Sequence, residues 1–116
     1  MSSIYNMREE KLYLADIKEA IDKIFLYTKG LSFEGFEADN KTIDAVMRNF
    51  EIIGEATKHL SDETRKGEPL QPWIEIVSMR NMLIHEYFGA DIVEVWKTIE
   101  SDLPSLRGSI IRLLGE

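Results

Sequence analysis

The chain has 116 residues, 44% of them hydrophobic, which is enough apolar material for one folded core. Its formal net charge of −7 argues against a protein that coats nucleic acids, because such proteins carry an excess of positive charge. The same charge leaves room for an RNA enzyme with a few cations gathered in a cleft, or for a protein with a basic partner. The absence of cysteine excludes disulfide bonds and thiolate metal ligands or nucleophiles. We expect a single cytoplasmic domain over residues 1–116, since no secretory signal pattern and no membrane-spanning apolar run is visible.

The first predicted element is an amphipathic helix. Apolar residues recur at three- and four-residue steps between residues 14 and 25, and charged residues fill the positions between them. We expect this helix to end near Lys29 and Gly30, because a cation followed by glycine is typical of a helix C-terminus. Residues 31–40 are predicted to form a loop, which two phenylalanines hold to the core.

A second amphipathic helix is predicted over residues 43–60. Asp39, Asn40 and Thr42 are the candidate N-caps in front of it. Gly54 falls inside this helix, where a glycine costs about 1 kcal/mol relative to alanine. A close helix crossing is the best reason for a glycine at this position, so we expect another helix to pack against it. The polar segment that follows is predicted to be a loop with one short turn.

Two further helical segments complete the chain. Pro72 suits the first position of a third helix, which is predicted to fade near Phe88. Asp91 and Glu94 have the spacing of a capping box at the start of a fourth helix. Pro104 either kinks that helix or starts a new one. The whole pattern predicts an all-α fold, a four- to five-helix up-and-down bundle.

Four polar residues interrupt the apolar third helix, and they are Arg80, Asn81, His85 and Tyr87. Asn81 and His85 are four positions apart, so they share one face of a helix, and Arg80 flanks that face. Tyr87 would point away on a straight helix, but a bend near Gly89 would turn it back toward His85. Helix packing alone gives no reason for an arginine and a histidine at these positions.

Arginine and histidine together supply what the cleavage of RNA requires. A guanidinium binds phosphate oxygens with two hydrogen bonds and stabilises the charge that develops on phosphorus. An imidazole, whose ordinary pKa is about 6.5, acts as a general base or acid near neutral pH. RNA carries its own nucleophile, the 2′-hydroxyl, so this reaction needs no metal ion. One chain supplies one such histidine, and a symmetric dimer would bring two to a shared cleft.

Plainer interpretations of the same residues remain open at this point. Arg80 would form an ion pair on the bundle surface, and His85 would be a hydrogen-bonded histidine at a helix end. Neither a metal nor a cofactor is expected, because two histidines without cysteine are a poor zinc site and the carboxylates are dispersed. His59 is expected to be a cation at the C-terminus of the second helix.

The spacing Arg80-x4-His85-x-Tyr87 resembles the RX4HXY motif of HEPN domains. The flanking stretches resemble the HepT-like branch of that superfamily, formerly a domain of unknown function. Those stretches are residues 44–49, 51–56, 72–73, 79–81, 85–88, 95–96 and 102–104. The resemblance covers nearly the whole chain in the same order, and this chain keeps every position of the motif.

The resemblance implies a helical bundle that dimerises, with the motif lining a cleft between the protomers. Family members of this kind are metal-independent ribonuclease toxins, and an MNT-type nucleotidyltransferase antitoxin can attach AMP to the motif tyrosine. By position, Arg80 and His85 would be catalytic, Asn81 would support them, and Tyr87 would be the AMPylation site. The implied partners are the antitoxin, an RNA substrate such as tRNA and a second copy of the chain, with no role for DNA or a membrane.

Two other functions are compatible with the sequence. The chain could be a non-catalytic helical module that binds its nucleotidyltransferase partner, with Tyr87 only as an acceptor of AMP or with a nucleotide held in the cleft. It could also be a plain oligomeric bundle whose exposed apolar surface is an interface. Fold alone does not decide among these functions, because one fold hosts many activities.

Overall fold

The computed structural model describes residues 3–86 and 91–116, with side chains described for residues 9–80 and 91–116. Every regular element in these residues is helical, which confirms the predicted all-α bundle. In chain order the elements are α1 (Ser3–Thr28), α2 (Phe33–Glu37), α3 (Asn40–Lys58), α4 (Asp62–Lys66), α5 (Trp73–Glu86), α6 (Ile92–Lys97), the π-helix η1 (Thr98–Asp102) and α7 (Leu103–Leu114).

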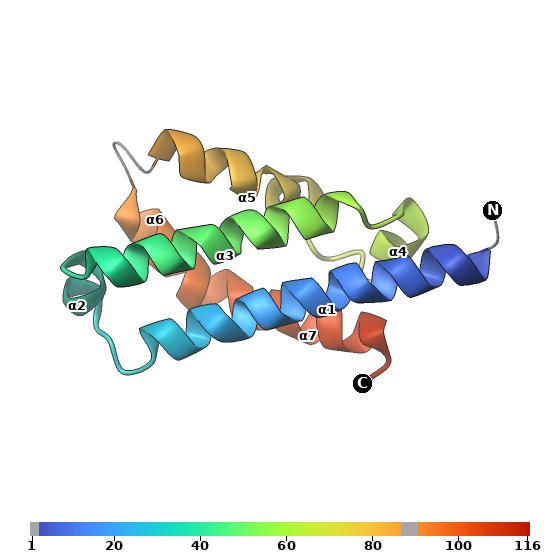
Figure 1. Cartoon of the computed structure of the whole chain (residues 1–116), viewed down its shortest axis with the longest axis horizontal. Coiled ribbons are helices and arrows are strands. Elements are labelled where there is room, and N and C mark those ends of the chain that lie inside the picture. The colour runs from blue at the N-terminus through green and yellow to red at the C-terminus, as the bar shows by residue number, and fades with distance from the viewer. Residues whose placement is uncertain (1–2, 87–90) are drawn as a thin grey trace.

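The four longest helices form the bundle. α3 packs against both α1 and α5, and α7 covers the other side of α1. Neighbouring long helices run in opposite directions, and α2 and α6 close one end of the bundle (Figure 1). Within the described residues, no helix is both long and apolar enough to cross a membrane. The arrangement places α3 beside α5, the helix that carries the polar motif.

α1 matches the predicted first helix, although it begins earlier than the periodic residues do. Its buried stripe includes Ile17, Ile21 and Ile24, none of which is exposed to solvent. The helix ends at Thr28, as predicted, and Gly30 has a φ of 78°. That left-handed conformation favours glycine and reverses the chain direction after the helix.

The segment predicted as a loop between α1 and α3 contains the short helix α2. Ser32 starts this helix, because its Oγ accepts a hydrogen bond from the backbone N–H of Gly35 at 3.1 Å. Phe36 is fully buried, and Phe33 is half-buried. Both rings contact Trp96, with ring centroids 5.1 Å and 6.4 Å apart respectively. The two phenylalanines therefore hold the segment to the core as predicted, although the segment is a helix.

Polar side chains cap the next two helices. Asp39 is the N-cap of α3, and its carboxylate accepts hydrogen bonds from the backbone N–H and the hydroxyl of Thr42 at 3.1 and 2.7 Å. These bonds lower the pKa of Asp39 below its ordinary value. Ser61 caps α4 in the same way, with its Oγ accepting from the N–H of Thr64 at 3.1 Å. α4 is the short turn predicted for this polar segment.

The boundaries of α5 and α6 differ in detail from the predictions. Pro72 lies one position before α5, and its carbonyl accepts the hydrogen bond of Ile76 N–H at 3.0 Å. α5 continues to Glu86, while the predicted end near Phe88 lies outside the described residues. Asp91 is the N-cap of α6, but its side chain makes no capping hydrogen bond, so the predicted capping box does not form.

Pro104 does not restart the helix, because α6, η1 and α7 follow one another without a gap and the chain adapts to the proline by a local widening. The proline has no N–H, and in a continuous α-helix its ring would collide with the carbonyl of Glu100, four residues earlier. The chain avoids this collision by widening into the π-helix η1, where Leu103 N–H donates to the carbonyl of Thr98, five residues back. α7 then begins with Pro104 in its first turn.

Candidate active site

Arg80 lies on α5, on the side of that helix that packs against α3. Its Nη1 donates a hydrogen bond to Glu55 Oε2 of α3 at 2.9 Å, so the two side chains form an ion pair. The hydrogen bond from Arg80 is the main cause that lowers the pKa of the Glu55 carboxyl below its ordinary value. The Arg80 side chain is 32% exposed, which leaves part of the guanidinium open to a ligand. The surface ion pair considered for Arg80 is present, and it joins two helices.

Gly54 sets the distance between α3 and α5 at the level of Arg80. A Cβ atom added to Gly54 would lie 2.9 Å from the backbone N of Arg80 and 3.0 Å from the carbonyl O of Val77. Real Cβ atoms essentially never approach other atoms so closely, so only glycine allows the two backbones to come this near. This contact confirms the close helix crossing that the glycine predicted.

Glu55 uses only part of the hydrogen-bonding capacity of Arg80. A guanidinium carries five N–H donors in a planar fork. Among the described residues, Glu55 accepts from Nη1, and the buried Nε has no hydrogen-bond partner. Because Nε is buried, an anionic ligand would have to bind the Nη groups at the exposed part of the side chain.

The other motif residues are placed by the backbone alone. Asn81 and His85 stand four positions apart on the continuous helix α5, which is the arrangement that a shared face requires. Their side chains lie outside the described part of the structure, and Tyr87 lies outside the described residues altogether, as does the predicted bend near Gly89. The roles assigned to these three residues stay predictions.

His59, the other histidine of the chain, belongs to the packing of α1 against α3. It is the C-cap of α3, as predicted, and its ring stacks on Tyr13 with centroids 4.6 Å apart. Its Nε2 is 3.9 Å from Glu55 Oε1, which is beyond hydrogen-bond distance. His59 is exposed and does not reach Arg80 through any described contact.

Sequence reasoning missed Glu55 as a partner of Arg80. The two residues are 25 positions apart, so their meeting depends on how α3 and α5 are set against each other. Gly54 is the signal that could have found the pair. A glycine that marks a helix crossing also marks its neighbour on the same helix as a candidate contact of the crossing helix.

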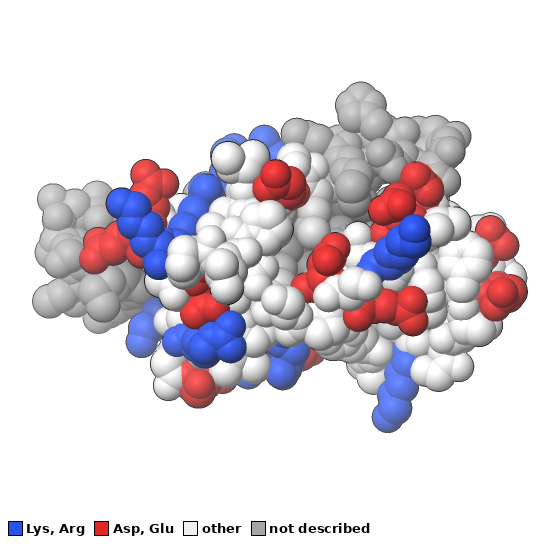
Figure 2. All heavy atoms as spheres, turned by 180° about the vertical axis from the view of Figure 1, so that it is seen from behind, with Lys and Arg blue, Asp and Glu red and all other residues white. Residues whose placement is uncertain are grey.

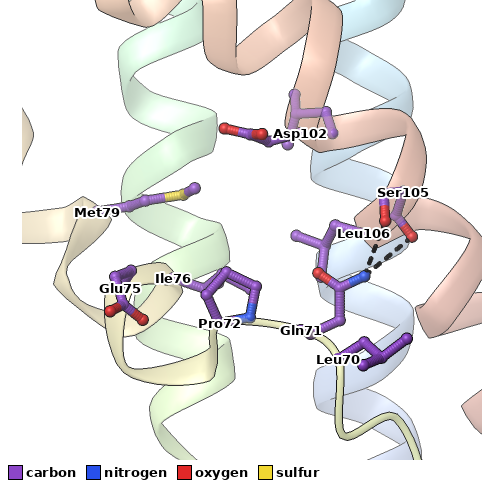
Figure 3. A pocket seen from close by; sticks show the side chains of 10 residues that line it. Leu70, Gln71, Pro72, Glu75, Ile76, Met79, Asp102, Ser105 and Leu106 are labelled. Atoms are coloured by element: carbon purple, nitrogen blue, oxygen red, sulfur yellow. Dashed lines mark hydrogen bonds between the residues drawn. The ribbon is translucent and has the colours of Figure 1, made fainter.

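Two surface cavities lie near α5 and α3, and neither is suited to phosphate. The first has a volume of about 220 Å³ and lies between the first half of α5 and the start of α7. Met79 and Asp102 point toward each other across it, and Gln71 donates to Ser105 at its edge (Figure 3). The second, of about 470 Å³, is lined by acidic and apolar residues and Asn40. No lysine or arginine lines either cavity, and a third cavity, between α1 and α3, places Lys23 beside Asp16 and Glu19. We place the candidate anion site at Arg80 instead.

Charged side chains are unevenly distributed on one face of the molecule. Acidic side chains gather at the end of the molecule that α2, α6 and η1 form, and acidic and basic side chains are mixed elsewhere on the face that Figure 2 shows. In the described part of the chain, no group of three or more metal-ligating side chains could hold an ion.

Comparisons with known proteins agree with the family resemblance of the sequence. The model of the family described as "Ribonuclease HepT-like" matches residues 17–113, which include every motif position. A Thermococcus cleftensis protein named "Probable ribonuclease HepT" is 46% identical, and the alignment covers 91% of this chain and 96% of the relative. A protein of Caldanaerobacter subterraneus named as a "Putative RNase" is 39% identical, and the alignment covers 93% of this chain and 96% of the relative. A "Putative RNase" of Methanocaldococcus jannaschii is 38% identical, and the alignment covers 89% of this chain and 94% of the relative.

No solved structure matches the chain at a significant level. The family model and the relatives together span the whole of α5 and the crossing with α3 that holds Arg80. The chain therefore belongs to the ribonuclease HepT-like family.

Proposed function

We propose that this protein is a metal-independent endoribonuclease toxin that cleaves RNA and is neutralised by an MNT-type nucleotidyltransferase antitoxin. The observation that carries the proposal is the position of Arg80. It is held at a helix crossing by Glu55 and is partly exposed, on the same helix as His85 five positions further on. The RNase names of the relatives support the same reaction class.

The proposed chemistry uses the 2′-hydroxyl of RNA as the nucleophile. His85 takes the proton from the 2′-oxygen, which attacks the adjacent phosphorus. The bond from phosphorus to the 5′-oxygen breaks, and that oxygen receives a proton from an acid, leaving a 2′,3′-cyclic phosphate and a 5′-hydroxyl. Arg80 donates to the phosphate oxygens, where negative charge grows in the transition state. Asn81 supports this pair, and the substrates include tRNA.

The proposed chemistry would use a homodimer, in which one His85 acts as the base and the His85 of the second copy acts as the acid. Ile74 on α5 is 78% exposed, and it stands seven and eleven positions before Asn81 and His85. These steps correspond to about two and three helical turns, so the three positions share one side of α5. A second copy that covers Ile74 would bring the two histidine positions toward a common cleft.

Tyr87 is the proposed site at which the antitoxin attaches AMP, two positions past His85. A phosphodiester placed there adds a negative charge and bulk next to the groups that must bind RNA phosphate, so it would block the reaction. The same modification fits the alternative function, in which the chain is a non-catalytic module for its partner. RNA cleavage by the AMP-free chain separates the two functions.

The test is cleavage of tRNA and other RNAs by purified protein in EDTA, with intact mass showing that no AMP is attached. We expect cleavage by the native chain and by His59→Ala, and none by His85→Ala. The two histidine variants remove the same group from the same protein, so their difference isolates the motif. A substrate with a 2′-deoxy sugar at the cleavage position should stay intact. No cleavage by the AMP-free native chain, together with AMPylation of Tyr87 by the partner, would favour the non-catalytic module.

A further inference from the structure

Two adjacent residues of α3 lie against Arg80, one near the base of its side chain and one at the tip. At its base, the crossing with α3 leaves only 3.2 Å between the Arg80 Cβ and the point where a Gly54 Cβ would be. At its tip, Glu55 Oε2 accepts a hydrogen bond from Nη1 at 2.9 Å. The two contacts come from adjacent residues of α3, so the crossing that brings the helices together also supplies the carboxylate.

The ion pair has little to offer the stability of the fold. Glu55 is 52% exposed and Arg80 is 32% exposed. A pair this exposed contributes little to stability, because water screens the charges and ordering two long side chains costs entropy. The conformation also leaves Arg80 Nε buried without a partner in the described residues, which is unfavourable for a polar group. Stability alone therefore does not explain why the guanidinium is held in this place.

Pre-organisation for a reaction does explain it. A free arginine side chain samples many rotamers, and each turnover would have to restrict them again. A guanidinium already fixed by a carboxylate loses less freedom when it binds a transition state, and its remaining donors point from a defined position. The carboxylate has an opposite effect on ground-state binding, because its negative charge repels the phosphates of RNA.

We propose that Glu55 is a positioning residue for RNA cleavage, which holds Arg80 where charge develops on the scissile phosphate. This inference rests on the proposed ribonuclease function. A carboxylate beside an RNA-binding cation would otherwise be expected only to repel the phosphates of the substrate. The proposed role makes a specific kinetic prediction, since Glu55 should favour turnover while opposing RNA affinity.

The experiment compares Glu55→Ala and Glu55→Gln with Glu51→Ala, a matched loss of an exposed carboxylate one turn earlier on α3. We expect Glu55→Ala to lower kcat by about 10- to 100-fold, the range that a misplaced catalytic group produces. KM should stay the same or fall, because a repulsive charge is removed. Glu55→Gln should retain more activity than Glu55→Ala, since its amide oxygen still accepts from Arg80. Glu51→Ala should behave like the native chain in kcat.

A double-mutant cycle with Arg80→Ala tests whether Glu55 acts through Arg80. We expect Glu55→Ala to cause no further loss in single-turnover cleavage once Arg80 is gone. An equal loss in both backgrounds would mean that Glu55 acts on something else and would overturn the proposal. In parallel, the Arg80 Nε–H resonance of ¹⁵N-arginine-labelled protein should shift in Glu55→Ala and not in Glu51→Ala.

The outcomes separate this inference from the proposed function. If the AMP-free native chain does not cleave RNA, the proposed function fails and the inference falls with it. If the native chain cleaves RNA and Glu55→Ala is as fast as Glu51→Ala, or faster, only the inference fails. The ion pair would then merely neutralise the cation.

Discussion

At the scale of single residues, Glu68 lies in a network of hydrogen bonds that reaches both α7 and the start of α5. Its carboxylate accepts hydrogen bonds from Arg112 Nη2 at 2.7 Å and from the Ser109 hydroxyl at 2.7 Å, both on α7. Its own carbonyl accepts from Trp73 Nε1 at 3.1 Å, at the start of α5. Glu68 is 17% exposed, and its bonds to Arg112 and Ser109 lower its pKa from 4.5 to about 2. This residue therefore ties the segment before α5 to α7.

The lowered pKa gives a stability that depends on pH. Glu68 is easier to ionise in the folded chain than in the unfolded chain, so its contribution is fully present above the ordinary pKa of 4.5. The contribution is lost as the pH falls from there through about 2. We expect Glu68→Gln to have a lower melting temperature than the native chain at neutral pH, with the difference shrinking below pH 4.5. Thermal unfolding over this range, with exposed Glu63→Gln as control, checks the prediction, and a difference independent of pH would contradict it.

The residue scale is also where prediction from sequence reached its limit. The motif spacing picked out Arg80, but nothing local to it named Glu55 or the bonds of Glu68 to α7. Both pairings join residues more than twenty positions apart, and they depend on the rotation and offset of packed helices. A periodic pattern of apolar residues specifies which face of a helix is buried. It does not specify how far that helix is shifted along the helix that it packs against.

At the scale of elements, the crossing of α3 and α5 is the contact on which the candidate site depends. The long helices α1 and α3 could be predicted because their apolar stripes repeat over several turns. The short helices α2 and α4 are too brief to show a period, and their Ser32 and Ser61 caps were the only local signal. The spacing of Asp91 and Glu94 predicted a cap that does not form, since spacing is necessary for that motif and not sufficient.

Replacing Gly54 with alanine tests the crossing directly. Alanine would favour the helix by about 1 kcal/mol. Its Cβ would meet the Arg80 backbone at 2.9 Å, however, and such overpacking costs about 1–3 kcal/mol because α5 must shift. We expect Gly54→Ala to lower the melting temperature and to lower RNA cleavage by displacing Arg80.

Gly108→Ala is the matched control, since Gly108 lies inside α7 and its Cβ would only meet the flexible end of Arg112 at 3.4 Å. This variant should be as stable as the native chain or more so. Calorimetry and cleavage assays on both variants check the expectation. Equal stability of the two variants would show that the crossing tolerates a side chain at Gly54.

At the scale of the whole molecule, the exposed apolar residues at the start of α5 bear on assembly. Ile74 of α5 is 78% exposed, and Leu70, three residues before α5, is 96% exposed and lines the same cavity as Pro72 and Met79. Apolar side chains so exposed, and so close in space to the motif helix, fit the proposed dimer. We expect light scattering to find a dimer of the native chain, and Ile74→Asp to shift it toward monomer with loss of cleavage.

Leu12→Asp is the control for that substitution, because Leu12 is 64% exposed on α1, on a different helix. It should leave the dimer and the cleavage rate unchanged. A monomeric native chain that cleaves RNA would contradict the shared cleft, and it would require a single chain to provide both the base and the acid.

The π-helix η1 restricts how chains of this fold can gain or lose residues between α6 and α7. Its wider turn accommodates one more residue than an α-helical turn, so it behaves as an insertion absorbed within a helix. Loss of one residue there would rotate α7 by about 100° about its axis. Arg107 would then turn away from Asp22, to which it donates at 2.6 Å. The wide turn of η1 accommodates Pro104. We therefore expect the additional residue of this turn and the proline to be gained or lost together as the family diverges.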